Sequence, residues 1–229
     1  MAVLEPLGIT TEGLAETAAT MMRQRQVLAD AMTRLAADAR EWGAVGMVSL
    51  SIDQLVRAVP DTALRLFADS LQRVSGARYR ARFRSLEPLY RQLMAGERTD
   101  GTLSGCLLRR GGDVLMICRE PGAIAPPLPL ATGETEWDQR WRVSVSVPDG
   151  LLVGALGSEG QAALVGQLDA AALDEWEGLP AEVRIGTPAI WRDAGGGVCG
   201  DLIAVPHAGF VAAGTAHLGE IAVEHIHRP

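Results

Sequence analysis

The spacing of apolar residues changes once along this chain, near Gly101. Before that point, apolar residues recur at steps of three and four, which is the spacing of one helix face. After it, short apolar runs separated by Gly and Pro predict β-strands joined in hairpins. Helices followed by hairpins indicate an α+β fold. We expect a helical domain over residues 1–97 and a β-hairpin-rich α+β domain over residues 98–229.

The longest helical pattern lies at the start. Thr10 or Thr11 is a suitable N-cap, and we expect this helix to end near Trp42. One face carries an apolar stripe that a single arginine interrupts: Leu14, Ala18, Met21, Arg25, Leu28, Met32, Leu35, Ala39 and Trp42. We expect the stripe to face the core, with partial exposure at the arginine. Packing against a partner helix is the alternative.

Three shorter helices are expected to follow. Ser51 and Gln54 have capping-box spacing for the first, Pro60 begins the second, and Gly76 ends it. The third contains Pro88, so it either begins close to this proline or kinks there.

Three hairpins are expected after residue 101. Their turns lie at Gly-containing sequences, residues 110–113, 148–150 and 194–197. The alternating run 141–147 predicts a half-buried strand, which the second turn joins to residues 151–156. A helix is expected over residues 158–178.

Charge is unevenly distributed. The net charge of −7 disfavours nucleic-acid binding, but residues 65–119 hold eleven arginines and five acids, a local charge of +6. Residues 1–64 carry −3 and residues 120–229 carry −10. All 21 basic residues are arginine, whose planar fork suits phosphate. The local field, more than the total, steers a polyanion.

The remaining composition indicates a cytoplasmic protein. Cys106, Cys118 and Cys199 are far apart and odd in number, which predicts reduced thiols in the core. No apolar run reaches the roughly 18 residues that cross a bilayer, and we expect no membrane partner.

Catalytic motifs are absent from the sequence. A Walker loop needs a lysine, and the chain has none. Gly154, Gly157 and Gly160 are expected to form a plain strand–helix turn, and His225 and His227 are too few to hold a metal. We therefore expect no catalytic residue, cofactor or metal in this chain.

The strongest positive feature is a set of arginines interleaved with Tyr79 and Phe83. The ten candidate nucleic-acid-binding residues are Arg73, Arg78, Arg80, Arg82, Arg84, Arg91, Arg98, Arg109, Arg110 and Arg119. Such a cluster would grip a nucleic-acid backbone with strong salt dependence. Pairing of these arginines with the acids of the C-terminal half is the alternative.

Several short motifs occur in a recognisable order: Leu7-Gly8-Ile9-Thr10, Tyr79-Arg80-x-Arg82, Thr102-Leu103-Ser104-Gly105-Cys106, Trp137-Asp138-x-Arg140-Trp141 and Pro188-Ala189-Ile190-Trp191-Arg192-Asp193. Over roughly residues 4–210 the chain resembles the C-terminal, non-catalytic region of bacterial tRNA(Ile)-lysidine synthases, which are PP-loop ATP-pyrophosphatases.

The resemblance implies a function for the parent enzyme. Such a synthase adenylates the wobble cytidine of tRNA(Ile) with ATP and magnesium, and lysine then displaces AMP. That chemistry belongs to a domain with a Ser-Gly-Gly-x-Asp-Ser loop, which this sequence lacks. The chain alone is therefore not expected to catalyse the reaction, and its apolar start suggests a longer parent chain.

The resemblance also implies partners and binding residues. The expected partners are tRNA(Ile) and the catalytic PP-loop domain, with Arg80, Arg82 and Arg119 best matching the tRNA-gripping role. A protein-interaction or homodimerisation module without nucleic-acid binding is the alternative function.

Overall fold

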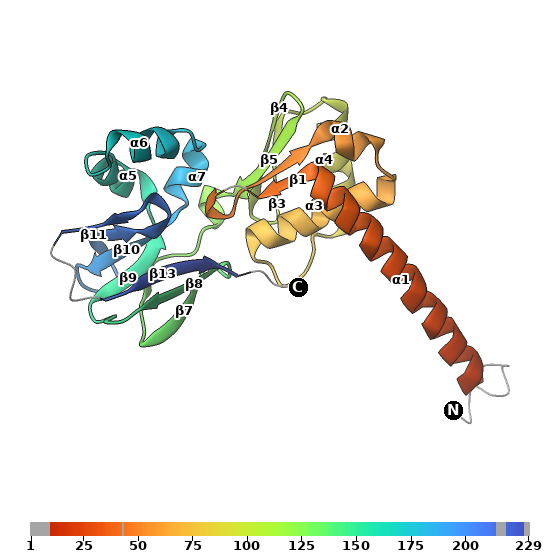
Figure 1. Cartoon of the computed structure of the whole chain (residues 1–229), viewed down its shortest axis with the longest axis horizontal. Helices are drawn as coiled ribbons and strands as arrows, with labels where there is room; N and C mark the ends of the chain where they lie inside the picture. Colours follow the sequence, from red (N-terminus) through yellow and green to blue (C-terminus); the bar gives the residue numbers. More distant parts are fainter. Residues whose placement is uncertain (1–9, 43, 214–218, 227–229) are drawn as a thin grey trace.

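The computed structural model describes residues 10–42, 44–213 and 219–226. They form two lobes (Figure 1). The N-terminal lobe comprises the described residues up to 119, and the C-terminal lobe comprises those from 120 onward. Helices and antiparallel strands occur in both lobes, which confirms the α+β class.

The N-terminal lobe is a five-stranded antiparallel sheet with helices packed on it. The sheet order is β1-β2-β5-β4-β3. The helices are α1 (Thr11–Ala39), α2 (Ile52–Arg57), α3 (Pro60–Ser75) and α4 (Phe83–Ala95). The strands are β1 (Arg40–Trp42), β2 (Val48–Ser51), β3 (Asp100–Leu103), β4 (Cys106–Gly111) and β5 (Val114–Arg119). Phe67 and Leu71 of α3 are fully buried in the same core as Leu108 and Ile117 of the sheet.

Local signals in the sequence explain where these helices begin and end. Ser51 Oγ accepts a hydrogen bond from the Gln54 backbone N–H at 3.3 Å, as a helix N-cap does. Gly76 ends α3 with a φ of 69°, a left-handed conformation that favours glycine. Helix α4 already begins at Phe83, so Pro88 lies inside the helix and removes one backbone hydrogen bond from it.

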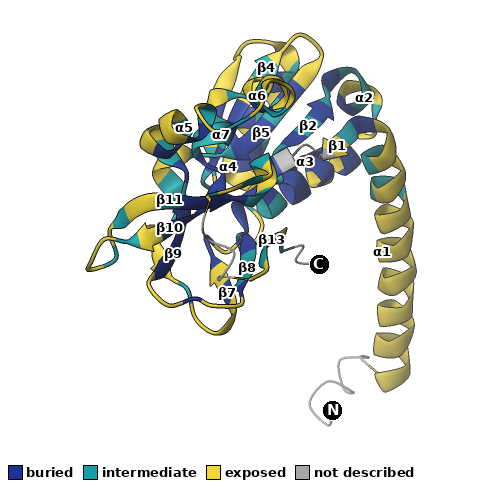
Figure 2. Ribbon diagram, turned by 60° about the vertical axis from the view of Figure 1, so that its left-hand side comes forward, coloured by how far each residue is buried: buried dark blue, intermediate teal, exposed yellow. Residues whose placement is uncertain are grey.

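The long helix α1 differs from its prediction in two ways. It begins at the expected Thr10 cap but ends at Ala39, because the next three residues pair with β2. Only its C-terminal end packs on the core, through residues such as Met32 and Leu35. Residues 11–30 are exposed along a helix that projects away from the lobe (Figure 2). The prediction of a core-facing stripe is wrong for this part, since the α1 residues that pack with the described core are Met32, Leu35, Ala36 and Ala39.

The C-terminal lobe contains two further sheets, with strand orders β12-β11-β10-β9-β6 and β13-β8-β7. Its helices are α5 (Gly157–Val165), α6 (Ala170–Glu177) and α7 (Ala181–Ile185). Its strands are β6 (Leu128–Pro129), β7 (Gly133–Trp137), β8 (Trp141–Val145), β9 (Leu151–Ala155), β10 (Pro188–Asp193), β11 (Cys199–Val205), β12 (Phe210–Val211) and β13 (Ile221–His225).

Two of the three predicted hairpins are confirmed. The turn at 110–113 joins β4 and β5 in the N-terminal lobe, and the turn at 194–197 joins β10 and β11 in the C-terminal lobe. The hairpin expected around 148–150 is wrong, because β8 pairs with β7 and β13 whereas β9 pairs with β10 and β6. The helix expected over 158–178 is two helices, because the Asp169 carboxylate caps the start of α6 by accepting from the N–H groups of Ala171 and Ala172.

The predicted division at residues 97 and 98 does not coincide with the division between hydrophobic cores. Strand β5 pairs with β2, and Cys106, Leu108, Leu115 and Ile117 share one core with the helices. Residues 98–119 therefore pack with the helical segment that precedes them. Within the described ranges, no helix is long and apolar enough to cross a membrane.

Candidate nucleic-acid interface

Arg119 occupies a buried site between the lobes. It donates from Nε and Nη2 to Asp138 at 3.2 and 2.8 Å, and from Nη1 and Nη2 to the carbonyls of Gly105 and Ala123 at 3.2 and 2.6 Å. Its side chain is only 10% exposed. Sequence reasoning placed Arg119 among the best tRNA-binding candidates, whereas the structure uses its guanidinium for internal contacts.

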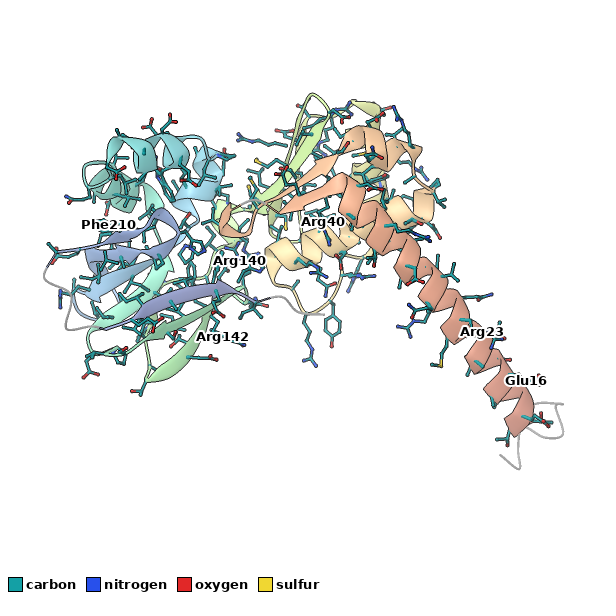
Figure 3. The ribbon with its side chains drawn as sticks, viewed as in Figure 1. Glu16, Arg23, Arg40, Arg140, Arg142 and Phe210 are labelled. Atoms are coloured by element: carbon teal, nitrogen blue, oxygen red, sulfur yellow. The ribbon has the colours of Figure 1, made fainter. Side chains whose placement is uncertain are left out.

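Asp138 is the centre of this buried joint. Arg140 Nε donates to it at 2.8 Å and the Ala125 N–H at 3.0 Å, and the side chains of both Asp138 and Arg140 are 1% exposed. Burial lowers the pKa of Arg140 below its ordinary value, and Asp138 opposes that shift. Figure 3 shows Arg140 where the two lobes meet. The Asp138 carboxylate thus links the C-terminal lobe to Arg119 of the N-terminal lobe.

Two more of the ten arginines make internal contacts. Arg109 on β4 forms an ion pair of 2.5 Å with Glu182 on α7, across the lobes. Arg110 donates to the carbonyls of Leu93 and Met94, where α4 ends and its carbonyls lack helical partners. The alternative reading, in which arginines pair with acids of the C-terminal half, thus holds for Arg109 and Arg119.

Around α3, arginines outnumber the acid that they share. The buried Asp69 lies 2.7 Å from Arg40 Nη1, 3.1 Å from Arg73 Nε and 3.6 Å from Arg80 Nη2. Asp69 therefore pairs with three guanidinium groups at once. The Arg80 side chain remains half-exposed beside this cluster.

Exposed arginines lie in the segment that links α3 to α4 and at the start of α4. Arg78, Arg82 and Arg84 are exposed. In the part of the chain that the structure describes, none of the three forms an ion pair, and the same holds for the exposed Arg98. Arg91 is also exposed but pairs with Glu87 one helical turn away.

Two aromatic side chains lie exposed among these arginines. Tyr79 is 76% exposed and Phe83 is 57% exposed. The Arg78 guanidinium lies over the Tyr79 ring, 5.6 Å from its centroid. We call residues 78–84 together with Arg65, an exposed residue of α3, the arginine–aromatic face. Exposed rings beside guanidinium groups can stack on bases while the cations hold phosphates.

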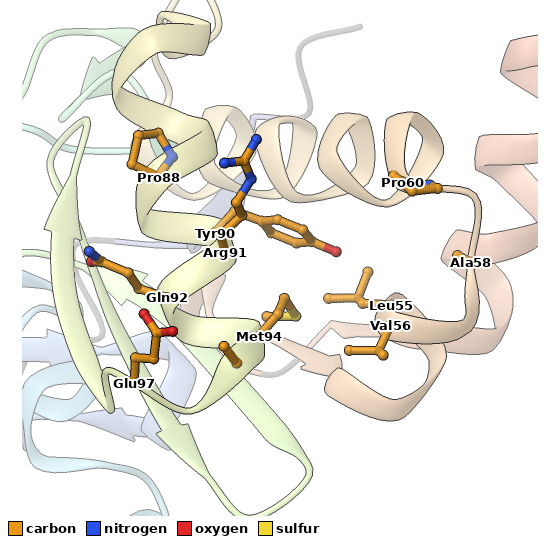
Figure 4. A pocket seen from close by; sticks show the side chains of 11 residues that line it. Leu55, Val56, Ala58, Pro60, Pro88, Tyr90, Arg91, Gln92, Met94 and Glu97 are labelled. Carbon is orange, nitrogen blue, oxygen red and sulfur yellow. The ribbon is translucent and has the colours of Figure 1, made fainter.

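Elsewhere in the N-terminal lobe, a cavity of about 700 Å³ lies between α2 and α4 (Figure 4). Its lining is mostly apolar and includes Leu55, Val56 and Met94. The Tyr90 hydroxyl points toward α2, and burial raises the pKa of Tyr90 to about 12. Proton transfer near neutral pH needs a group that titrates there, which this hydroxyl does not.

The cysteines are free thiols. Burial raises the pKa of Cys106 to about 12 and that of Cys118 to about 11, so both stay protonated at neutral pH and are poor nucleophiles. Among the described residues, no group of three or more His, Cys, Asp or Glu side chains is placed to hold a metal. His227 lies outside the described residues.

Sequence reasoning missed the two aspartates that organise the arginines. Asp69 and Arg73 are four residues apart on one helix, a spacing that predicts their ion pair. The Asp138 joint spans segments far apart in sequence and has no such local signal.

Comparison with known proteins identifies relatives. The chain is 30% identical over 222 residues to the tRNA(Ile)-lysidine synthase of Ruegeria pomeroyi, covering 95% of this chain and 48% of the relative. It is 29% identical over 142 residues to the synthase of Wolbachia pipientis wMel, covering 60% and 32%. The synthase of the Brugia malayi Wolbachia is 28% identical over 105 residues, covering 44% and 24%.

No family model and no solved structure matches the chain. It spans about half the length of the Ruegeria relative and less of the other two. The similarity to the first relative extends over nearly the whole chain and includes both lobes. Over nearly its whole length the chain is therefore similar to part of a tRNA(Ile)-lysidine synthase.

Proposed function

We propose that this chain is the tRNA-binding region of a cytoplasmic tRNA(Ile)-lysidine synthase and that its arginine–aromatic face contacts the tRNA backbone. The observation that carries the proposal is the exposure of Arg78, Arg82 and Arg84 with no ion pair to any described residue. Free guanidinium groups bind phosphate oxygens through charge-assisted hydrogen bonds. The names of the relatives supply the RNA that would be bound.

The charge difference between the lobes supports an oriented complex. Residues 65–119 carry +6 and residues 120–229 carry −10. A polyanion is attracted to the first region and repelled by the second. The contacts at Asp138 would keep the acidic lobe beside the bound RNA, so the RNA would approach the N-terminal lobe alone.

Under this proposal the chemistry takes place on a PP-loop domain outside this sequence. That domain would bind ATP and magnesium and adenylate the wobble cytidine of tRNA(Ile) with release of pyrophosphate, and lysine would then displace AMP from the activated cytidine. Two facts support this division: the chain spans 48% of the Ruegeria synthase, and no Ser-Gly-Gly-x-Asp-Ser loop occurs within it.

Fluorescence anisotropy with labelled tRNA(Ile) at low salt tests the binding role. The double variant Arg82→Ala/Arg84→Ala should weaken binding by about three- to thirtyfold, if each exposed ion pair contributes about 0.3–1 kcal/mol. Arg142→Ala/Arg192→Ala removes the same charge from the acidic lobe and should leave the Kd unchanged within twofold. Equal weakening by both pairs, or no measurable binding by the unmodified chain, would refute the proposal.

A second candidate function is protein interaction through α1. The helix exposes Leu14, Met21, Met22, Val27 and Leu28. Grouped apolar side chains on a surface mark contact sites. The partner would be the catalytic domain or a second copy of the chain. Light scattering that gives a monomer, together with no binding to a separately expressed PP-loop domain, would exclude this function.

A further inference from the structure

A small cavity of about 280 Å³ lies beside the arginine–aromatic face, between α3 and the start of α4. The buried side chains of Leu64 and Leu86 form its apolar part, and the exposed Phe83 lines it as well. Arg65 and Arg80 belong to its wall. One cavity is thus lined by an aromatic ring, apolar side chains and two arginines.

The size of the cavity limits what can enter. Pockets for drug-sized ligands hold roughly 300–1,000 Å³. A cavity of about 280 Å³ lies just below that range, which suits a single planar ring and not a whole nucleoside triphosphate. An apolar floor with an aromatic wall favours a flat apolar face, and the two arginines favour an anion next to it.

A nucleotide of RNA combines a flat ring with phosphates on either side. We propose that this cavity receives one unpaired base of the bound RNA, stacked on Phe83, while Arg65 and Arg80 hold its flanking phosphates. The proposal rests on RNA binding by the arginine–aromatic face and adds the class of nucleotide that the face selects. A base inside a duplex is stacked between its neighbours and cannot enter, whereas bases in loops and at ends can.

Phe83 is a better stacking partner than its neighbour Tyr79. The Arg78 guanidinium already lies over the Tyr79 ring, 5.6 Å from the centroid. Phe83 is an exposed ring whose surroundings include the cavity. Stacking on an aromatic ring tolerates every base, because each has a π-face.

Asp61 adds a polar preference within the cavity. It lies in the first turn of α3 and belongs to the cavity lining. A carboxylate accepts hydrogen bonds, so it favours a base edge that carries an amino group. The same charge repels phosphate from the interior, which leaves the anions to the arginines at the wall.

The test compares unpaired with paired RNA on the full 229-residue chain. The probe is a single-stranded RNA that carries one 2-aminopurine, used alone and annealed to its complement. We expect the single strand to bind more tightly and to change its fluorescence on binding. Phe83→Ala should weaken single-strand binding by about 5- to 150-fold, the effect of losing one base–aromatic stack. Duplex binding should stay within twofold.

Two further variants control this experiment. Phe83→Tyr keeps a ring and should keep the affinity, and Val56→Ala removes an exposed apolar side chain at the other cavity and should have no effect. Equal affinity for both RNAs, or a Phe83→Ala change below twofold, would overturn the inference. If tRNA(Ile) binding still depends on Arg82 and Arg84 in that case, the proposed function stands without the base pocket.

Discussion

Asp138→Asn tests whether the buried joint holds the two lobes together. Asp138 accepts four hydrogen bonds, from Arg119 Nε and Nη2, Arg140 Nε and the Ala125 N–H. The residue has a φ of 51°, which asparagine tolerates, so the substitution removes the charge and keeps the backbone. Two buried guanidinium groups then face a neutral amide. The amide NH₂ group replaces one carboxylate oxygen, so N–H donors there face another donor in place of an acceptor.

The expected cost follows from burial. Removing one partner of a buried ion pair typically destabilises a protein by about 3–5 kcal/mol, and we expect about 3 kcal/mol because the amide oxygen still accepts. Urea unfolding should show this loss at an unchanged m-value. Tm should fall by about 6–12 °C for a chain of this length.

An exposed ion pair provides the matched control. Glu134 pairs with Arg142 at 3.1 Å, and the two side chains are 63% and 42% exposed. Glu134→Gln should therefore cost less than about 1 kcal/mol. A loss below about 1 kcal/mol for Asp138→Asn, or an equal loss for both variants, would show that the joint does not stabilise the fold as we argue.

Three further predictions concern packing, pH and the long helix. An added Cβ at Gly160 would lie 2.6 Å from the Trp191 ring, so Gly160→Ala should destabilise the chain by about 1–3 kcal/mol in urea unfolding, and an unchanged midpoint would contradict this. Burial lowers the pKa of His207 below 6.5, so its contribution to stability is present above pH 6.5 and lost as pH falls through the folded pKa. His207→Gln should flatten this loss in unfolding measured from pH 7 to 5, and a curve as steep as that of the unmodified chain would refute it. Met21→Ser on the exposed part of α1 should change the free energy of unfolding by about 0.5 kcal/mol at most, which corresponds to less than about 2 °C in Tm. A larger fall in Tm would show that this part of the helix packs against other residues.

Helix ends and local turns were predictable because their signals are local. The Ser51 cap, the Pro60 start and the Gly76 end each depend on residues within one helical turn. The hairpin turn at 194–197 is also local, since the Asp193 carboxylate accepts from the N–H groups of Gly195 and Gly197.

Strand partners were not predictable, because pairing joins residues far apart in the chain. Strand β8 alternates buried and partly exposed residues as expected, but alternation does not say which strand lies beside it. Its neighbours are β7, just before it, and β13, near the C-terminus. The sequence pattern predicts a helix as far as Trp42, but residues 40–42 form strand β1. Their pairing with β2 outweighs the helical pattern.

The candidate site shows the same limit. The clustering of arginines in the sequence points to residues 78–84, and the structure places these arginines on the surface. Here residues that are close in sequence are also exposed together. It also selected Arg110 and Arg119, whose partners are a helix end and a buried carboxylate that only the fold brings near. Binding of tRNA by the exposed arginines stays a prediction.

The salt dependence of tRNA(Ile) binding tests this central claim most directly. Each phosphate contact releases counterions, so log Kd changes linearly with log salt concentration and the slope counts the contacts. We predict that Arg78→Ala/Arg82→Ala/Arg84→Ala reduces the slope by about 2–3, roughly one for each lost contact. An identical slope for the variant and the unmodified chain would contradict the account, because these arginines would then touch no phosphate.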